Sequence, residues 1–396
     1  MHIGIDGLPL TSPKTGVGHY TFELARALAQ AAPENTFELV YPSSYPLVTL
    51  DKNQAGNDLP GNLKLERVPV GPLARRWWSN GLPRYVRRNR IELFHGTNYD
   101  VPLWRRCPTV LTIHDLSLVL HPQTHQKRSV RRARRRLPLM ARTADAIITP
   151  TESIRKEVCD HLGIDAEKVF AIPEAARSSF RPMEFAATED TRRRLAIGDE
   201  FLLAVGTIEP RKNLRTLVAA FEQVIVERPQ TSLQLVIAGG RGWLSGPLFD
   251  AIEKSPVRDR LILTDYLHDE ELRALYASCR AFIYPSIYEG FGLPPLEAMA
   301  CGAPVIASNI PALAETTGTA ALLFDPVNAA DLARNILALL RNENLRDKLS
   351  NDGRRRASEF SWNRSATETL SVYTDALNEF TSRGRAGARK KIFTQP

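Results

Sequence analysis

The chain has 396 residues, of which 43% are hydrophobic and 24% charged, and its formal net charge is +8. This composition lies in the ordinary globular range, and the length predicts two or three domains. No apolar run approaches the roughly 18 residues that a membrane span needs, and the four cysteines lie far apart without a C-x-x-C pair. These features argue against a membrane-spanning protein, a zinc site and a disulfide framework.

The N-terminal half alternates short apolar, β-branched runs with longer helical patterns. Because Met1 leads directly into the first of these runs, with no secretory leader pattern, we expect a cytoplasmic protein. Runs such as Ala146-Ile147-Ile148 are continuously apolar, as a parallel sheet covered on both faces requires. The predicted strands are His2–Asp6, Phe37–Tyr41, Leu63–Val68, Ile91–Phe94, Val110–His114, Ala146–Pro150 and Val169–Ile172.

The C-terminal half repeats this alternation after a polar, irregular stretch. Phe201–Val205 begins a second series of strands. The chain ends in helical patterns, and Phe360-Ser361-Trp362 interrupts them before the last helix. The sequence therefore predicts an α/β protein with two doubly wound, Rossmann-like halves. Ligands of open α/β sheets bind beyond the carboxyl ends of the strands, so we expect the chemistry in the loops that follow strands.

The strongest motif runs from Tyr288 to Gly302 and contains Glu-Gly-Phe-Gly-Leu-Pro-Pro-Leu-Glu-Ala-Met-Ala-Cys-Gly. A strand is expected to end before it and a helix to begin near Pro294, which suits the first helical turn. The free N–H groups of a helix start bind phosphate, and Gly292 allows the backbone to approach it closely. The carboxylates of Glu289 and Glu297 can accept hydrogen bonds from sugar hydroxyls, although a lone Glu in such a place is also a common helix cap.

Glu289 and Glu297 are eight positions apart in this run, which resembles the E-x7-E signature of the retaining glycosyltransferase family 4, and the resemblance covers almost the whole chain. The resemblance implies a GT-B fold, with two facing Rossmann-like domains and a central cleft. It implies that Glu297 holds the nucleotide ribose, that Glu289 holds the transferred sugar or the adjoining phosphate, and that the backbone at Gly292 and Leu293 holds the diphosphate. The expected parts are an acceptor-binding domain over 1–180, a linker over 181–198, a nucleotide-sugar-binding domain over 199–360, a helix over 361–380 that crosses back to the first domain, and a basic disordered tail over 381–396.

A second motif, Val205-Gly206-Thr207-Ile208-Glu209-Pro210-Arg211-Lys212-Asn213, follows the first strand of the second half. Two cations beside a phosphate seat can neutralise a leaving nucleoside diphosphate without a metal. The resemblance implies this catalytic role for Lys212, while Thr207 stands where the family has its arginine and Arg211 is expected to supply that charge. The alternative is a surface pair that caps the following helix.

Further donor and acceptor contacts are implied by the family resemblance alone. Gly16 and Gly18 resemble its glycine-rich loop over the donor phosphates, with His19 on the acceptor side. His114 would contact the donor sugar, or serve as a structural group. Asp115 would lie near the acceptor or be structural, and Tyr266 would lie where the family binds the base.

We therefore expect a hexosyltransferase that transfers mannose from GDP-mannose to a hydroxyl of a glycan or a polyprenyl-linked oligosaccharide. GDP-rhamnose and UDP-sugars remain open as donors, and a nucleotide-sugar epimerase or hydrolase is the rival of another class. No cofactor and no metal are expected, since the sequence has no D-x-D motif and its histidines are scattered.

The cationic residues are clustered in three blocks, which attract polyanions or form solvated helix faces. They lack the interleaved aromatics of nucleic-acid-binding proteins apart from Trp77-Trp78, so we expect no nucleic acid. Peripheral attachment to the anionic inner face of the plasma membrane is the favoured role. The blocks are Arg75, Arg76, Arg84, Arg87, Arg88 and Arg90; Lys127, Arg128, Arg131, Arg132, Arg134, Arg135 and Arg136; and Arg383, Arg385, Arg389, Lys390 and Lys391.

Overall fold

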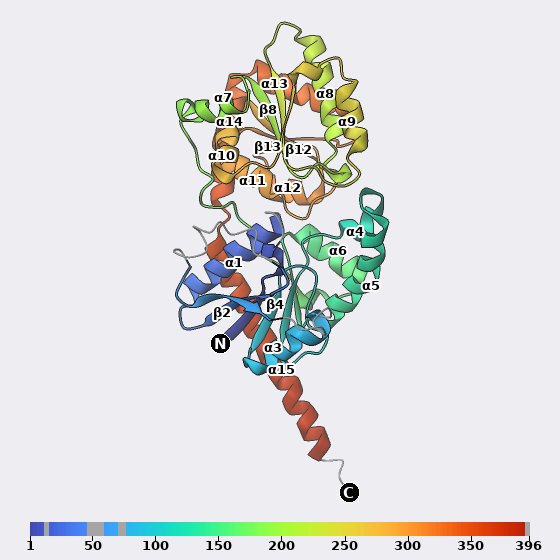
Figure 1. The fold of residues 1–396 in the computed structure, drawn as a ribbon, viewed down its shortest axis with the longest axis vertical. Coiled ribbons are helices and arrows are strands. Elements are labelled where there is room, and N and C mark those ends of the chain that lie inside the picture. The colour runs from blue at the N-terminus through green and yellow to red at the C-terminus, as the bar shows by residue number, and fades with distance from the viewer. Residues whose placement is uncertain (12–15, 46–58, 70–76, 393–396) are drawn as a thin grey trace. The chain divides into compact units, whose positions relative to one another are not determined.

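The structure is a computed structural model that describes residues 1–11, 16–45, 59–69 and 77–392, with side chains up to Ser382 (Figure 1). The chain divides into two compact units. The first consists of residues 1–116, 132–174 and 362 onward, and the second of residues 117–131 and 175–361. The first unit is therefore completed by the C-terminal end of the chain.

The first unit is built on a seven-stranded sheet in the order β3-β2-β1-β4-β5-β6-β7, with every pair parallel. The central strand β1 pairs on both sides, with Ile3 opposite Phe37 of β2 and Leu93 of β4. These side chains are fully buried, which explains why the strands read as continuous apolar runs. The strands are β1 (His2–Asp6), β2 (Thr36–Pro42), β3 (Leu63–Val68), β4 (Leu93–Gly96), β5 (Thr109–Thr112), β6 (Ala146–Thr149) and β7 (Val169–Ala171).

Helices α1 (Gly16–Ala31) and α15 (Trp362–Ile392) pack together over one core of this sheet. Tyr373 of α15 is fully buried there, and its hydroxyl lies 2.7 Å from Nδ1 of His95 in β4. The other described α-helices of this unit are α3 (Leu82–Arg88) and α6 (Glu152–Leu162). Between β5 and β6, α4 (Ser117–Leu120) belongs to the second unit, and α5 (Lys127–Thr143) begins in the second unit and continues in the first from residue 132.

A second core of the first unit contains Trp77, which is only 7% exposed and packs with Leu82 and Val86. Trp77 therefore does not form an aromatic surface beside the first basic block, because its ring packs in this core with residues of α3. Arg75 and Arg76 of the same block lie outside the described residues.

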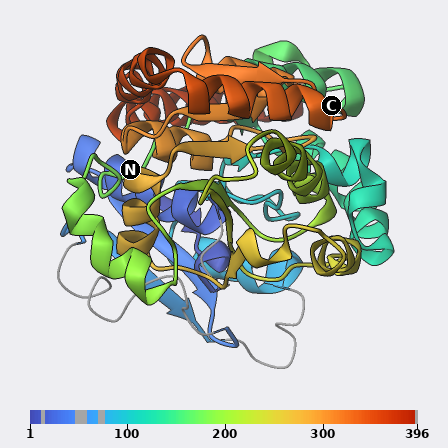
Figure 2. The ribbon, with the colours of Figure 1, turned by 90° about the horizontal axis from the view of Figure 1, so that it is seen from above.

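The second unit has six parallel strands in the order β10-β9-β8-β11-β12-β13. Helices α8, α9 and α13 contribute to the core on one face, and α10, α11 and α12 to the core on the other. Helices α13 and α14 lie side by side, orange-red in Figure 2. The strands are β8 (Phe201–Val205), β9 (Gln234–Ala238), β10 (Leu261–Thr264), β11 (Ala281–Tyr284), β12 (Val305–Ser308) and β13 (Ala321–Phe324). The helices are α7 (Glu189–Arg194), α8 (Leu214–Glu227), α9 (Gly246–Glu253), α10 (Asp269–Ser278), α11 (Leu293–Ala300), α12 (Pro311–Thr317), α13 (Ala329–Arg341) and α14 (Glu343–Ser358).

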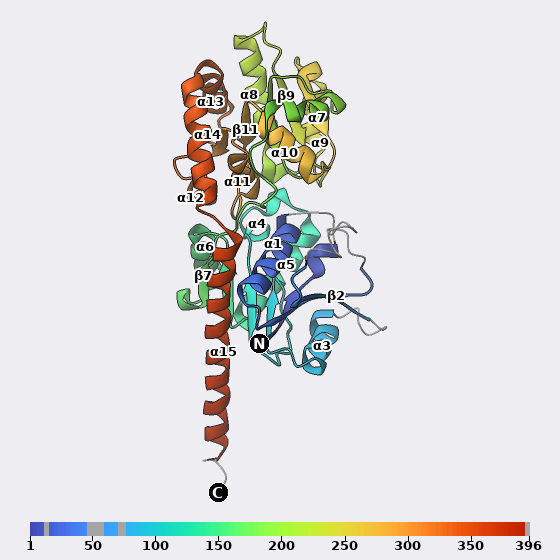
Figure 3. The same cartoon turned by 90° about the vertical axis from the view of Figure 1, so that its left-hand side faces the viewer.

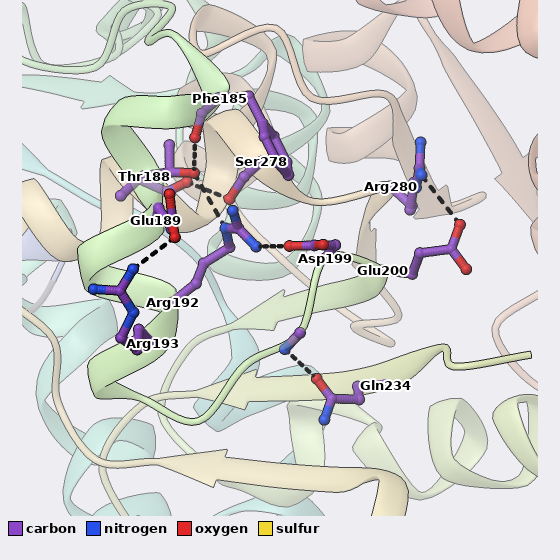
Figure 4. Close-up of polar contacts among 12 residues, drawn as sticks. Phe185, Thr188, Glu189, Arg192, Arg193, Asp199, Glu200, Gln234, Ser278 and Arg280 are labelled. Carbon is purple, nitrogen blue, oxygen red and sulfur yellow. Dashed lines mark hydrogen bonds and ion pairs between the residues drawn. The ribbon is translucent and has the colours of Figure 1, made fainter.

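The stretch 181–198, expected as a linker, is ordered and belongs to the second unit. It contains the short helix α7, whose Arg192 is only 4% exposed. The Arg192 guanidinium stacks on the ring of Phe185 at 4.3 Å and pairs with Asp199, as Figure 4 shows. The polar residues that suggested a linker thus form a network of ion pairs.

The C-terminal helix is longer than the sequence indicated. Figure 3 shows α15 as one long helix that continues to Ile392, where we expected a helix that ends at 380 and then an irregular tail. The extension is rich in Ala, Arg and Lys, whose intrinsic helix propensities are high. Glycine and net charge had suggested disorder, but they do not outweigh this preference.

Candidate active site

One asparagine connects the loops that follow three strands of the second unit. Asn213 has a left-handed backbone (φ 52°) and begins α8, directly after the loop that follows β8. Its Nδ2 donates to the carbonyls of Pro285, beyond β11, and Pro326, beyond β13, at 3.0 and 2.8 Å. Three loops are thereby fixed at the sheet edge where open α/β proteins bind ligands.

The loops after β8 and β9 approach each other so closely that glycine is required. A Cβ on Gly239 would lie 2.1 Å from the carbonyl oxygen of Gly206, and both residues have positive φ. Thr207 follows in this loop and is exposed. The approach explains the glycine at the start of the motif. The exposed Thr207 is not one of the four buried side chains of the charged cluster described next.

Four charged side chains form a cluster between the β8 loop and the β11 loop. Lys212 Nζ lies 2.6 Å from Glu289 Oε1 and 2.7 Å from the hydroxyl of Tyr284. Arg211 Nη1 lies 2.8 Å from Glu289 Oε2, and its Nη2 lies 2.7 Å from Oε1 of Glu209. The four side chains are between 2% and 13% exposed, so the cluster is buried and internally neutral.

Burial and ion pairing shift the pKa values in this cluster in opposite directions. Burial opposes ionisation of Glu289, but the charges of Arg211 and Lys212 outweigh it and lower the pKa of Glu289 to about 2. Burial lowers the pKa of Lys212 below its ordinary value, although Glu289 opposes this shift. Burial raises the pKa of Glu209, against the pull of Arg211. An additional anion would therefore stabilise the charged form of Lys212.

Helix α11 begins directly after the β11 loop. Gly292 precedes it with φ 107°, and a Cβ there would lie 2.6 Å from the side chain of Leu313. Leu293 is the first helical residue, so the N–H groups of the first turn have no partner within the helix. Arg211 and Lys212 lie in the loop after β8 and contact Glu289 in the loop after β11, at the end of which α11 begins. This edge of the sheet therefore combines cations with free N–H groups, as an anion site does.

Glu297 lies in α11 and is paired with a residue that the sequence analysis did not single out. Its Oε1 accepts from Arg177 Nε at 2.8 Å, and Arg177 Nη1 lies 2.7 Å from Asp269 of α10. Tyr266 precedes α10 and is 45% exposed. Partial burial and the nearby carboxylates of Asp269 and Glu297 raise the pKa of Tyr266 to about 12. Glu289 and Glu297 therefore belong to two different ionic clusters of the second unit.

In the first unit, His114 lies two residues beyond the end of β5 and is 8% exposed. Its Nε2 donates to the Thr97 carbonyl at 2.8 Å, and its Nδ1 lies 3.2 Å from Glu174. Burial alone would lower the pKa of His114, but the pairing with Glu174 raises it above its ordinary value. Because both ring nitrogens contact acceptors, the geometry favours the charged imidazolium.

The remaining expected residues of the first unit occupy two places. Gly16, Gly18 and His19 form the first turn of α1, while Thr15 lies outside the described residues. The backbone N–H of Asp115 donates to the hydroxyl of Tyr99 at 3.1 Å. Within the described residues, no group of three or more His, Cys, Asp or Glu side chains is arranged to hold a metal ion.

Sequence reasoning missed Glu209 and Arg177. Glu209 lay in the quoted motif, but nothing in the motif shows that its carboxylate would hold Arg211. Arg177 lies 120 residues from Glu297, so no local pattern connects them. Only the folded chain brings Arg177 and Glu297 together.

Comparisons with known proteins agree with this architecture. Residues 14–176 match the profile of the family described as Glycosyltransferase Family 4, and residues 187–356 match that of Glycosyl transferases group 1. Solved structures of similar fold include a sucrose-phosphate synthase from Thermosynechococcus elongatus (TM-score 0.75, 21% identity, 96% of this chain and 100% of that one). Another is WaaG, a glycosyltransferase involved in lipopolysaccharide biosynthesis (TM-score 0.70, 15% identity, 94% of this chain and 100% of that one).

Among curated relatives, an Escherichia coli protein named O-antigen chain mannosyltransferase B is 31% identical over 373 residues, which cover 92% of this chain and 97% of the relative. The E. coli serotype-specific mannosyltransferase WbdA is 29% identical over 95% of this chain, which spans 48% of that longer protein. The chain therefore belongs to glycosyltransferase family 4, and its two parallel-sheet units are those of the GT-B fold.

Proposed function

We propose that this glycosyltransferase transfers mannose from GDP-mannose to a hydroxyl of a glycan or polyprenyl-linked oligosaccharide, with retention of the anomeric configuration. The observation that carries the proposal is that two buried cations, Arg211 and Lys212, contact Glu289 in the loop that leads into α11. The names of the mannosyltransferase relatives favour the sugar. GDP-rhamnose and UDP-sugars are the alternative donors.

The proposed chemistry depends on charge that is in place before the reaction. Glu209 and Glu289 hold Arg211 and Lys212 fixed, so little reorganisation is needed when a diphosphate binds beside them. As the bond between the anomeric carbon and the diphosphate breaks, these cations and the N–H groups of α11 stabilise the negative charge of the leaving group. The acceptor oxygen bonds to the same face of that carbon, and its proton passes to the departing phosphate oxygen.

The residues expected to contact sugar and nucleotide complete the proposal. Glu289 would accept from the hydroxyls of the transferred sugar, and Glu297 from those of the ribose, while Tyr266 would lie beside the base. His114 would contact the donor sugar as a cation, since its ring is paired with Glu174. Asp115 and His19 are proposed to lie on the acceptor side.

The test is steady-state turnover with a panel of GDP-mannose, GDP-rhamnose and UDP-glucose, each with and without polyprenyl-linked acceptor. We expect GDP release from GDP-mannose only with acceptor, a product whose anomeric configuration by NMR matches that of the donor, and unchanged rates in EDTA. Failure to release GDP from GDP-mannose with any polyprenyl-linked acceptor would refute the choice of donor. Product formation without acceptor would instead indicate an epimerase or a hydrolase, and loss of activity in EDTA would refute metal independence.

Helix α5 is the described segment that best fits attachment to an anionic membrane. Val130, Leu137 and Met140 face the protein, while its opposite face exposes Lys127, Arg128, Arg131, Arg132, Arg134, Arg135 and Arg142. Each cation near an anionic leaflet contributes about 1 kcal/mol of attraction. We propose that α5 holds the enzyme near a lipid-linked acceptor. Within the described residues no helix combines the length and the apolar composition that a bilayer span requires.

A further inference from the structure

The side chain of Arg177 forms a buried bridge between two helices of the second unit. Its guanidinium stacks on the ring of Phe180 at 4.3 Å, and the residue as a whole is only 8% exposed. Nε donates to Glu297 Oε1 of α11 at 2.8 Å, and Nη1 lies 2.7 Å from Asp269 Oδ1 of α10. A buried arginine is tolerated only where its charge and its donors are matched in this way.

The partner Glu297 is itself 5% exposed. Burial raises the pKa of Glu297, and the charge of Arg177 opposes this rise. Without Arg177 the carboxyl group would take up a proton at a higher pH and would lose the contact that fixes its orientation. Arg177 engages Oε1, so Oε2 is the carboxylate oxygen that this contact leaves for a ligand.

We propose that Arg177 is a positioning residue for the nucleotide: it holds Glu297 ionised and oriented through Oε1, so that Oε2 can accept from the 2′- and 3′-hydroxyls of the donor ribose. This inference rests on the proposed role of Glu297 as the ribose ligand. Asp269 fixes the other end of the guanidinium. A lysine could not replace the arginine fully, because one ammonium cannot contact both carboxylates with the geometry of a planar fork.

The experiment measures ribose selectivity, the ratio of the Kd of 2′,3′-dideoxy-GDP to the Kd of GDP, by calorimetry with the full-length enzyme. If the wild type binds UDP more tightly than GDP, the same ratio is measured with 2′,3′-dideoxy-UDP and UDP. Arg177→Met should lower this ratio by about tenfold, which corresponds to one hydrogen bond to a charged group. Its affinity for the dideoxy nucleotide should stay unchanged, because that ligand makes no contact with Glu297.

Arg192→Met is the matched control. Arg192 belongs to the same unit, is similarly buried, stacks on Phe185 at 4.3 Å and pairs with Asp199 (Figure 4). Neither of these two partners belongs to the proposed site. The control substitution should lower stability and leave ribose selectivity unchanged. If Arg177→Met does not fold, Arg177→Lys and Asp269→Asn replace it, and both should lower the ratio by a smaller factor.

The outcomes separate this inference from the proposed function. If Glu297→Gln lowers ribose selectivity and the Arg177 variants do not, the positioning role of Arg177 is refuted while Glu297 remains the ribose ligand. If Arg177→Met weakens both nucleotides equally, its role is structural and the inference is again refuted. If Glu297→Gln leaves the selectivity unchanged, the proposed role of Glu297 fails, and that of Arg177 fails with it.

Discussion

Replacing Lys212 by methionine should separate the stabilising role of the charged cluster from its catalytic role. The substitution keeps the length of the side chain and removes an ammonium that lies 2.6 Å from Glu289 and 2.7 Å from the hydroxyl of Tyr284. Breaking a buried ion pair by removing one partner costs about 3–5 kcal/mol. Because Arg211 still contacts Glu289 at 2.8 Å, we expect a loss near the lower end of that range.

The effect on turnover should be separable from this loss. Removing one preorganised donor to developing charge lowers kcat by about 10²–10³-fold. Glu289→Gln added to Lys212→Met removes the carboxylate that was left partly unpaired, so the double variant should regain part of the stability. It should not regain turnover, because the cation at the leaving group is still absent.

The pH dependence of stability provides a second test of this prediction. The pKa of Glu289 is lowered from 4.5 to about 2, so its stabilising contribution is fully present above about pH 4.5 and is lost as the pH falls toward 2. In Lys212→Met the pKa of Glu289 rises toward its unfolded value, so the variant should lose less stability than the wild type as the pH falls below about 4.5. Urea unfolding at fixed pH values between about 2 and 8 and GDP release from GDP-mannose measure the two effects. Wild-type turnover in Lys212→Met, or a double variant less stable than the single one, would refute the reasoning.

Three further predictions concern other parts of the chain. Gly292→Ala forces a Cβ against a leucine at a backbone φ of 107°, and should lower the free energy of unfolding by about 1–3 kcal/mol and weaken nucleotide binding, as seen by thermal unfolding with and without GDP. Tyr373→Phe removes the hydroxyl on Nδ1 of His95 and should cost about 1–3 kcal/mol in urea unfolding. Burial lowers the pKa of His95 to about 3, so wild-type stability should fall as the pH drops from about 6.5 toward 3, whereas a pH-independent stability would contradict the neutral, buried ring. Arg131→Glu with Arg135→Glu reverses two exposed charges of α5 and should abolish flotation with anionic liposomes at ~0.1 M salt without changing turnover on a soluble acceptor; unchanged flotation would exclude α5 as the membrane contact.

The sequence predicted many of the strands well because most of them are buried on both faces. Phe201–Val205 has the same bounds in the structure as in the prediction, and Ala146–Pro150 differs by one residue at its end, since an uninterrupted apolar run has few alternatives in an α/β chain. The amphipathic helices were also recognisable by their period. Helix α5 was not assigned, because eight of its residues are cations and the segment was interpreted only as a basic block.

The site was predictable only where its residues are close in sequence. Arg211, Lys212 and Glu289 came from two local motifs, and the structure brings them into direct contact. The pairing of Arg177 with Glu297 was not predictable, because it depends on long-range packing. The burial of Trp77 was not predictable either, because composition alone does not distinguish a surface tryptophan from a buried one.

The return of α15 to the first unit has a consequence for synthesis of the protein on the ribosome. Residues from 362 onward complete a core that begins with β1, and Tyr373 supplies its buried centre. The N-terminal unit must therefore wait, with apolar surface uncovered, while the whole of the other unit is translated. At ~5–20 residues per second this delay lasts on the order of ten seconds or longer, a window in which chaperones would have their greatest effect on yield.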